Sequence, residues 1–364
     1  MNNITRHDEP LKVETENHGD FLSLPGRLYP PKACPRNRAT EKELLENSHV
    51  LSHYFELFVF TARRGNDAAT RCALTIYPGD TTAYLGFFDS ENDREAATAL
   101  FEAVERFAMS RGLNHVVGPV DASFWLGYRL KINKFDKAPY FAEPCGLPWY
   151  QGLWEHNGYR ATDLYSSHAF VDPPNTYHNE KFAVRLRDFL AQGYRISSPD
   201  RKDWDKTIGE IYGLIVRLYS DFPVFKFITE HDFRSHYADL QHIVDWSMVK
   251  VAYWHDEAVG FFISVPDYGC LLNQPLTPSV VSRALLTRKR PGRYVMLYMG
   301  VDPAHTGLGK AITQTIISEV VKKHVPVIGA LIHEGKINER YVEEMIAEKY
   351  HYLLFEKSLG SATQ

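Results

Sequence analysis

The chain has 364 residues, of which 44% are hydrophobic, and this length favours two domains over one. A formal net charge of −4 gives no overall positive field, which disfavours a protein that binds mainly to nucleic acid. Four scattered cysteines show no metal-ligand spacing, so we predict neither a metal site nor a disulfide framework. No signal-peptide pattern or membrane-length apolar run occurs, so we expect a cytoplasmic protein with no membrane partner. We expect it to be a monomer or a homodimer.

The first half begins with a polar segment. Residues 1–45 are rich in Pro and Arg, which predicts an arm that packs irregularly before the first domain. A helix is predicted at 90–112, because an acidic start is followed by regularly spaced apolar residues and a stop at Gly112. A second, shorter helix is predicted at 148–158. Apolar runs predict strands at 53–63, 71–78, 82–89, 114–120 and 161–171.

The second half has a similar order of predicted helices and strands. A hairpin is predicted at 248–267, with its turn at 255–257, and strands are predicted at 292–303, 325–334 and 351–359. The basic run at 283–293 is interpreted as a solvated loop, because Pro291 and Gly292 interrupt it. Helices are predicted at 203–222, 230–244, 307–324 and 338–350.

Both halves therefore read as hairpin, strand, helix, strand, helix, strand. This order is a weak internal repeat with a period of about 150 residues. The Pro- and Asn-rich segment at 171–180 is the natural connection between the halves. The predicted fold class is mixed α/β.

The stretch YMGVDPAHTGLGKAIT, residues 298–313, combines a strand, a glycine turn and a helix start. The first N–H groups of a helix have no partners within it, and the helix dipole favours an anion there. Gly307 and Gly309 remove side chains that would keep an anion away, and Lys310 adds a cation. The motif is neither a Walker A loop nor a dinucleotide fingerprint. Taken alone, it fits either an anion site or an ordinary tight helix start.

The order of elements around this stretch resembles the acyl-CoA-binding core of the GNAT acyltransferase superfamily. The resemblance implies acetyl-CoA or another acyl-CoA as cofactor, with its pyrophosphate on the glycine loop and its acyl-pantetheine arm along the preceding strand. It assigns Met299, Gly300 and Val301 to the arm, and Asn338 to a further cofactor contact. The pyrophosphate would be held by Thr306, Gly307, Leu308, Gly309, Lys310 and Ala311.

Two positions depart from the pattern of the family. Ala304 stands where the family usually has Arg or Gln, and Met345 stands where it often has a general-acid Tyr. The segments at 21–31, 84–104, 112–124, 156–166 and 258–268 are similar to an uncharacterised bacterial family. That family has two such units, each a mixed, mostly antiparallel, twisted sheet flanked by helices. That similarity implies an N-terminal unit at 46–172 and an acyl-CoA-binding unit at 173–364. The N-terminal unit would be degenerate and without a phosphate loop, because its helix start at 90–96 is acidic.

Acyl transfer from a thioester needs a donor to the carbonyl oxygen, a base and an acid. The donor would be a backbone N–H at Gly300 or Val301. Glu334 is the predicted catalytic base, with His333 as an alternative base or a substrate contact, and Tyr341 is the predicted acid. Asp267 and Tyr298 are predicted to contact the acceptor. Each has a structural alternative: a solvated strand end for the bases, a turn cap for Asp267, and packing for Tyr341.

Three functional hypotheses follow. The first is an acyl-CoA-dependent N-acyltransferase that acts on a small amine or amino-acid-like acceptor. The second is an aminoacyl transferase that uses charged tRNA, with the basic run at 283–293 as the RNA contact. The third is a binding protein that keeps the fold without the chemistry. The sequence has neither a GxSxG nor an HExxH motif, so a hydrolase has no support.

Overall fold

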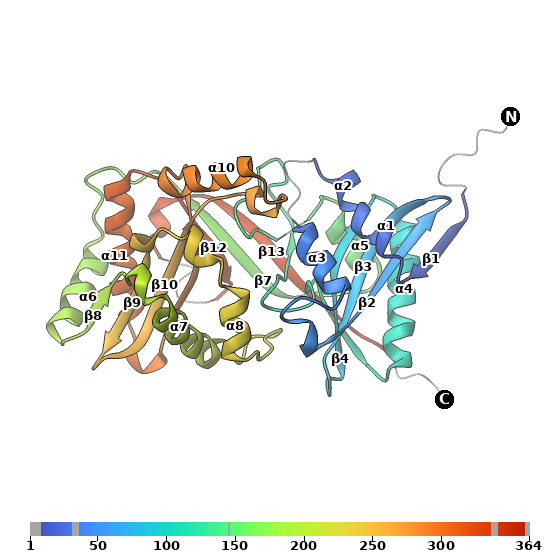
Figure 1. Ribbon diagram of the computed structural model, residues 1–364, viewed down its shortest axis with the longest axis horizontal. Helices are drawn as coiled ribbons and strands as arrows, with labels where there is room; N and C mark the ends of the chain where they lie inside the picture. The colour runs from blue at the N-terminus through green and yellow to red at the C-terminus, as the bar shows by residue number, and fades with distance from the viewer. Residues whose placement is uncertain (1–8, 31–35, 145, 336–340, 361–364) are drawn as a thin grey trace. The chain divides into compact units, whose positions relative to one another are not determined.

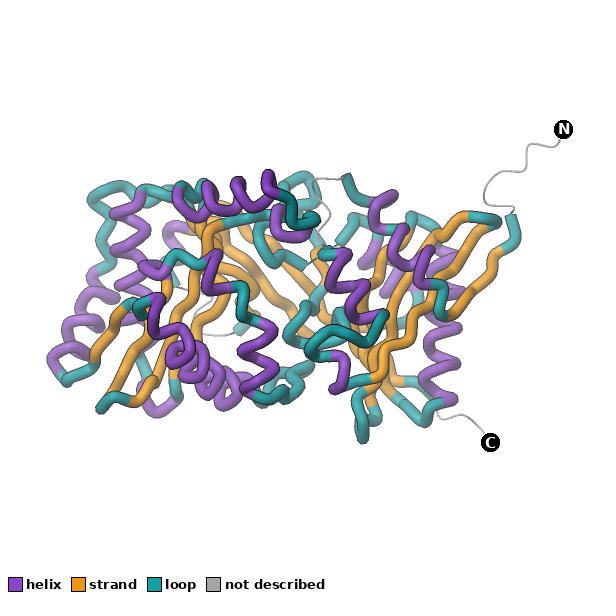
Figure 2. Tube along the Cα trace, viewed as in Figure 1, coloured by secondary structure: helices purple, strands orange, loops and turns teal. Residues whose placement is uncertain are grey.

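The computed structural model describes residues 9–30, 36–144, 146–335 and 341–360, and Figure 1 shows its course from the N-terminus in blue to the C-terminus in red. The chain forms two compact units. The first comprises Met1–Leu164, Asn273–Pro275 and His351–Gln364, and the second comprises Tyr165–Leu272 and Leu276–Tyr350. In each unit, strands form a sheet that helices cover, as Figure 2 shows by colour. The mixed α/β prediction, with mostly antiparallel strands flanked by helices, is confirmed.

The sheet of the first unit has the strand order β1-β2-β3-β4-β5-β13. Only β4 and β5 run parallel among the described pairs of this sheet. The short strand β6 (Leu130–Lys131) also pairs with β13. The bounds are β1 Leu11–Thr15, β2 Glu56–Arg64, β3 Asp67–Ile76, β4 Thr82–Ser90, β5 His115–Gly118 and β13 Ile346–Ser358.

Helices lie on both faces of this first sheet. On one face, α4 (Arg94–Ser110) buries Leu100, Phe101 and Val104 in an apolar core, to which α5 (Tyr150–His156) adds Trp154. Residues at i, i+3, i+4 and i+7 of a helix share one face, which explains this burial. The opposite face carries α1 (His18–Ser23), α2 (Pro25–Leu28) and α3 (Arg38–Leu45).

The prediction of an irregular arm at residues 1–45 is wrong for the described residues. β1 adds to the edge of the sheet through pairing with β2, and α1 to α3 follow it. Glu41 of α3 forms an ion pair with Arg71 of β3, whose side chain is fully buried. A buried cation needs a partner, so this segment is an integral part of the unit.

The sheet of the second unit has the strand order β7-β12-β11-β10-β9-β8. Only β11 and β12 run parallel among the described pairs. The predicted hairpin at 248–267 is present, and His255 and Asp256 adopt positive φ at its turn. The bounds are β7 Arg160–Phe170, β8 Arg195–Ser197, β9 Val249–Trp254, β10 Glu257–Pro266, β11 Tyr294–Val301 and β12 Val327–His333.

The helices of the second unit also cover both faces. A Cβ on Gly260 would contact Ile312 of α11, whereas a Cβ on Gly300 would contact Leu218 of α7. Gly260 is opposite Val301, and neighbouring strand residues point to opposite faces, so α11 and α7 lie on different sides of the sheet. The bounds are α6 Glu180–Ala191, α7 Trp204–Tyr219, α8 Glu230–His236, α9 Leu240–Ile243, α10 Pro278–Lys289 and α11 Leu308–Lys323.

The two units are not contiguous in sequence, unlike the expected segments at 46–172 and 173–364. β7 leaves the first unit after Leu164 and pairs with β12 of the second sheet. The C-terminal half of β13 returns to the first unit, where Phe355 is opposite Gly118 of β5. Each half of the sequence therefore supplies a closing strand to the unit built mainly by the other half.

Two local predictions are wrong. The basic run at 283–293 is not a loop, because α10 extends to Lys289 and Pro291 follows its end, as is common after a helix C-cap. The helix predicted at 338–350 is absent from the described residues 341–350, where a 3-10 turn at Glu343–Met345 leads into β13. The alternating exposure along Ile346–Tyr350 is that of a strand, and strand pairing overrides helix propensity here.

Candidate functional site

The strands β11 and β12 separate part of the way along their length. Their parallel pairing includes Tyr294, Val295 and Met296, and it ends at the pair Met296 and Gly329. A bulge follows on β11, because Ile263 is opposite Tyr298 whereas Ser264 is opposite Met296. The extra residue, Leu297, increases the local twist of β11. Beyond it, the edge of β11 that faces β12 has no β-ladder partner in the described pairing.

The backbone direction along β11 follows from its pairing with β10. The N–H of Asp302 donates to Val259 O at 2.9 Å. Hydrogen-bonded pairs alternate in an antiparallel ladder, so the amide of Gly300 also points toward β10. The amides of Met299 and Val301 therefore point toward the separation. Of the two predicted carbonyl donors, the geometry favours Val301 over Gly300.

The predicted glycine loop joins β11 to α11 and lies at the start of that helix. Gly307 is the N-cap residue with a φ of 94°, and no side chain caps the helix. This left-handed conformation is easily reached only by glycine. A Cβ on Gly307 would meet only Phe189 and Arg185 within 4.0 Å, so the approach is open. The first amides of α11 are thus available to an anion.

Two cations lie at this helix start. Arg185 of α6 places its Nε 4.0 Å from the Cβ position of Gly307, and Lys310 lies in the first turn of α11. Neither cation forms a hydrogen bond or ion pair within the described part of the chain. Arg187, two residues further along α6, is instead paired with Glu180 at 3.0 Å. Arg185 therefore places a positive charge beside the glycine loop, although the loop has Ala304 at the position where Arg or Gln was expected.

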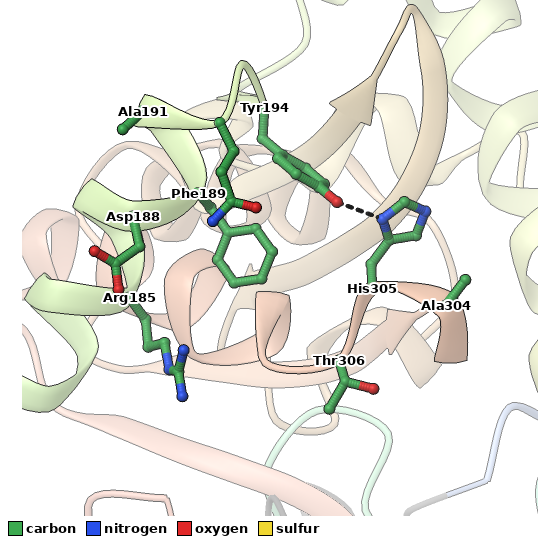
Figure 3. Close-up of a pocket in the computed structure, with 9 residues that line it drawn as sticks. Arg185, Asp188, Phe189, Ala191, Tyr194, Ala304, His305 and Thr306 are labelled. Atoms are coloured by element: carbon green, nitrogen blue, oxygen red, sulfur yellow. Dashed lines mark hydrogen bonds between the residues drawn. The ribbon is translucent and has the colours of Figure 1, made fainter.

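A pocket of about 550 Å³ opens between α6 and the glycine loop (Figure 3). His305 of the loop is held by Tyr194, whose hydroxyl lies 2.7 Å from its Nδ1. Figure 3 shows Arg185 on α6 and His305 and Thr306 on the loop among the side chains around the pocket. The lining residues are Arg185, Asp188, Phe189, Ala191, Gln192, Tyr194, Ala304, His305 and Thr306.

Tyr341, the predicted acid, lies beside the first turn of α11. Its hydroxyl is 3.1 Å from the Cβ position of Gly309, and Met299 Cε is 3.6 Å from that position. Its ring packs on Phe182 of α6, with centroids 5.2 Å apart. Burial raises the pKa of Tyr341, so its hydroxyl stays protonated at neutral pH. The structure therefore brings together Met299, Gly309 and Tyr341, three of the predicted residues.

The two predicted base candidates differ in their surroundings. His333 ends β12, and its ring contacts Tyr165 and Phe222 edge-on, at 4.9 and 6.1 Å between centroids. Phe222 also packs on Tyr219, whose hydroxyl donates to Met299 O on β11. Glu334 follows in an exposed turn. An aromatic cluster thus connects His333, but not Glu334, to the separated part of β11.

The predicted acceptor contacts are engaged within the protein. Asp267 forms an ion pair with Arg293 at 2.6 Å and accepts the N–H of Gly269, so it stabilises the turn after β10. Tyr298 hydrogen-bonds to Tyr237, and burial raises the pKa of Tyr237. Asn338, the further predicted cofactor contact, lies outside the described residues.

The corresponding places in the first unit are filled by the protein itself. Asp93 caps α4 by accepting the N–H of Ala96, in contrast to the uncapped start of α11. At the irregularity of β4, Asp121 accepts the N–H of Phe87, and Val120 N donates to Leu85 O. A Cβ on Gly86 would lie 1.8 Å from Val120 O. Past its pairing with β5, the edge of β4 therefore has partners at Val120 and Asp121, whereas the corresponding edge of β11 has no ladder partner among the described residues.

Sequence analysis did not identify α6 as part of the site. Arg185, Phe189 and Tyr194 all line the pocket, and Phe189 packs edge-on against Tyr194 at 4.9 Å. The signal for α6 was its amphipathic pattern behind the N-cap Asn179, but nothing in that pattern indicates a contact with Gly307 more than 100 residues later.

The described residues contain no group of His, Cys, Asp and Glu side chains that could hold a metal ion.

Comparisons with known proteins found one similarity in sequence and several in fold. No protein-family model matches the chain. Protein YghO of Escherichia coli K12 is 22% identical over 266 residues, which cover 68% of this chain and 65% of that protein. A solved tandem GNAT protein from the clavulanic acid biosynthesis pathway has a TM-score of 0.53 at 12% identity.

A second solved structure has a similar score. It is a GCN5-related glucosamine N-acetyltransferase region of a fungal multi-domain β-N-acetylglucosaminidase, with a TM-score of 0.54, 13% identity, and coverage of 96% of this chain and 38% of that one. The match to the tandem GNAT protein covers 96% of this chain and 99% of the other. At these identities the likeness concerns the fold alone. This chain therefore has a tandem GNAT fold, the architecture of the GCN5-related N-acetyltransferases.

Proposed function

We propose that the second unit is an acyl-CoA-dependent N-acyltransferase that transfers an acyl group, in the simplest case acetyl, to a small amine or amino-acid-like acceptor. The observation that carries the proposal is the uncapped start of α11 at Gly307, directly after a strand that has separated from its neighbour. In a GNAT fold these two features create a phosphate site continuous with an open strand edge. The first unit has neither, so we assign it no cofactor.

The residues present suit a pyrophosphate and a pantetheine arm. The open amides of the first turn of α11 can donate to phosphate oxygens, and Arg185 and Lys310 can neutralise their charge. The free edge of β11 can pair with the amide groups of the arm, since it lacks a β-ladder partner past Met296. Acyl-CoA, when bound, supplies an activated acyl thioester.

The residues of the chain would then supply the carbonyl donor, the acid and the base. The N–H of Val301 can stabilise negative charge on a carbonyl oxygen, because its direction follows from the β10 pairing. Tyr341 holds its phenolic proton near the strand and can act as the acid. We propose His333 as the base, since the aromatic cluster connects it to β11. Glu334, the base predicted from the sequence, is the alternative.

Binding of coenzyme A, measured by calorimetry and by thermal unfolding, tests this proposal. The protein should bind it and unfold at higher temperature, because a ligand that binds only the native state stabilises that state. Arg185→Ala should weaken binding roughly tenfold, as expected for loss of a charge-assisted phosphate contact. The matched control is Arg187→Ala, which removes an exposed, paired cation from the same helix and should leave the affinity unchanged.

The outcomes separate the hypotheses. Absence of binding at millimolar coenzyme A would overturn the acyl-CoA proposal and promote the tRNA-dependent or non-catalytic alternatives. Steeply salt-dependent binding of charged tRNA would then distinguish the first of these from the second. Binding of coenzyme A without transfer of an acyl group to any amine would support the third hypothesis, a binding protein without catalytic activity.

A further inference from the structure

The helix α10 is the feature of the second unit that the proposed function does not use. Between Leu276 and Arg290 the sequence has no acidic and no aromatic residue, but it has four basic ones. Arg288 anchors the helix by donating to His242 O at 2.7 Å. Val280 is the buried side chain of the helix. In Figure 1 α10 runs along the upper margin of the second unit.

Large apolar side chains are exposed along this segment. Leu276 is 81% exposed, Leu285 52% and Leu286 59%, and Val281 adds 45%. These are four of the eight large exposed hydrophobic residues in the described part of the chain. Single exposed leucines need no explanation, whereas a concentration on one helix indicates an interaction surface.

Cations share this exposed surface. Successive residues of a helix are about 100° apart, so Leu285 and Leu286 lie about 140° and 120° around α10 from the buried Val280, and Val281 lies about 100° from it. Of the exposed cations, Lys289 follows Leu285 by one turn on the outer side, Arg283 lies about 60° around the helix from Leu286, and Arg290 is the C-cap residue. The nearby carboxylate of Asp267 is already paired with Arg293. The exposed side chains of α10 therefore include large apolar groups and cations, and the helix itself carries no acid.

We propose that α10 docks the protein on an anionic phospholipid surface. The leucines enter the boundary between headgroups and acyl chains, and the cations pair with anionic headgroups, as in helices that lie in the plane of a membrane interface. Charge complementarity selects an anionic occupant. The exposed leucines and the absence of aromatic side chains for base stacking favour lipid over RNA.

This inference revises the expectation of no membrane partner, and it is independent of the proposed catalytic activity. No helix in the described ranges is long and apolar enough to cross a bilayer. The proposed contact needs no such helix, because α10 would lie on the surface. A symmetric pairing of two copies through α10 is disfavoured, since it would place like charges against each other.

Co-sedimentation of the full chain with phospholipid vesicles tests the proposal. The protein should bind vesicles of phosphatidylcholine that contain about 30% of the anionic lipid phosphatidylglycerol. It should not bind vesicles of pure phosphatidylcholine. The double variant Leu285→Ser with Leu286→Ser should lower binding about tenfold, because the inserted apolar area is lost. Arg283→Gln with Lys289→Gln should lower it on the order of tenfold and reduce its sensitivity to salt.

A matched control removes exposed apolar side chains elsewhere. Val184→Ser with Leu190→Ser alters α6, whose two side chains are 37% and 47% exposed, and should leave vesicle binding unchanged. Failure to bind anionic vesicles at low salt would overturn the proposal, as would binding that the α10 variants do not alter. Binding to polyglutamate but not to vesicles, with the same dependence on α10, would instead show a surface for an acidic protein.

Discussion

Two residues at equivalent positions of the two units show how one side chain decides whether a helix start can receive an anion. Asp93 closes the start of α4 with its carboxylate, and Arg64 pairs with that carboxylate at 2.7 Å. Gly307 leaves the start of α11 open, with Arg185 beside it. A carboxylate both occupies the amides and repels phosphate, so the first unit cannot share the proposed role of the second.

At the same scale, Tyr341→Phe tests the proposed acid. We expect kcat to fall about 100-fold, a typical contribution of general acid catalysis, with little change in the affinity for coenzyme A. Because burial raises the pKa of Tyr341, the acid form persists at alkaline pH, and the wild-type rate should decline only above the ordinary tyrosine pKa. Steady-state kinetics from pH 6 to about 10.5 would measure both effects.

The control for this prediction is Tyr177→Phe, which removes a hydroxyl that donates to Glu344 in the same unit. It should keep the wild-type kcat. An unchanged kcat for Tyr341→Phe would move the acid elsewhere, with Tyr298 as the next residue to test.

Among the elements, α3 shows why the N-terminal segment cannot be an appendage. Glu41 bonds both Nη atoms of Arg71, at 2.9 and 2.7 Å, and the guanidinium also bonds Asp89. Arg71 is fully buried within the sheet face that α1 and α3 cover. An uncompensated buried charge is costly, so the ion pair ties α3 to the sheet.

Glu41→Ala should therefore lower the free energy of unfolding by about 3 kcal/mol. Urea denaturation followed by circular dichroism would measure the change. Lys42→Ala, in the next residue, removes only an exposed i,i+4 pair with Glu46 and should change stability by less than about 0.5 kcal/mol. A loss below about 1 kcal/mol for Glu41→Ala would show that Asp89 alone compensates Arg71.

Sequence patterns predicted the core elements, and the failure at 338–350 has a clear physical cause. The core helices α4, α7 and α11 and the strands β9 to β12 lie where periodicity and glycine stops placed them. The helix expected at 338–350 consists of good helix formers, but Ile346–Tyr350 is part of the long strand β13. Propensity is local and weak, and pairing with distant strands outweighs it.

For the whole molecule, the exchange of closing strands is the main consequence of the fold. Phe355 of β13 is fully buried in the core of the first unit, where its ring stacks on Trp154 at 5.6 Å. Tyr352 is equally buried and donates to Glu143 at 2.9 Å. The first unit thus depends on the last residues of the chain for both apolar and polar core contacts.

A fragment of residues 1–172, cut at the boundary expected from sequence, should therefore fail to fold cooperatively. It would lack the strand that pairs with β5 and would expose the core around Trp154. Thermal unfolding by circular dichroism and amide spectra by NMR would report the loss. Adding the peptide 346–364 should restore a cooperative transition, and a fragment that unfolds cooperatively without it would refute this dependence.

The sequence by itself determined the fold class, the repeated order of elements and the position of the glycine loop, because these depend on local periodicity and on glycine at particular turns. Only the tertiary structure decided which strand closes each sheet, where β11 leaves β12, and that Arg185 reaches the loop at Gly307. Strand edges offer the same backbone groups whatever their sequence. Their partners are therefore selected by the packing of the whole chain.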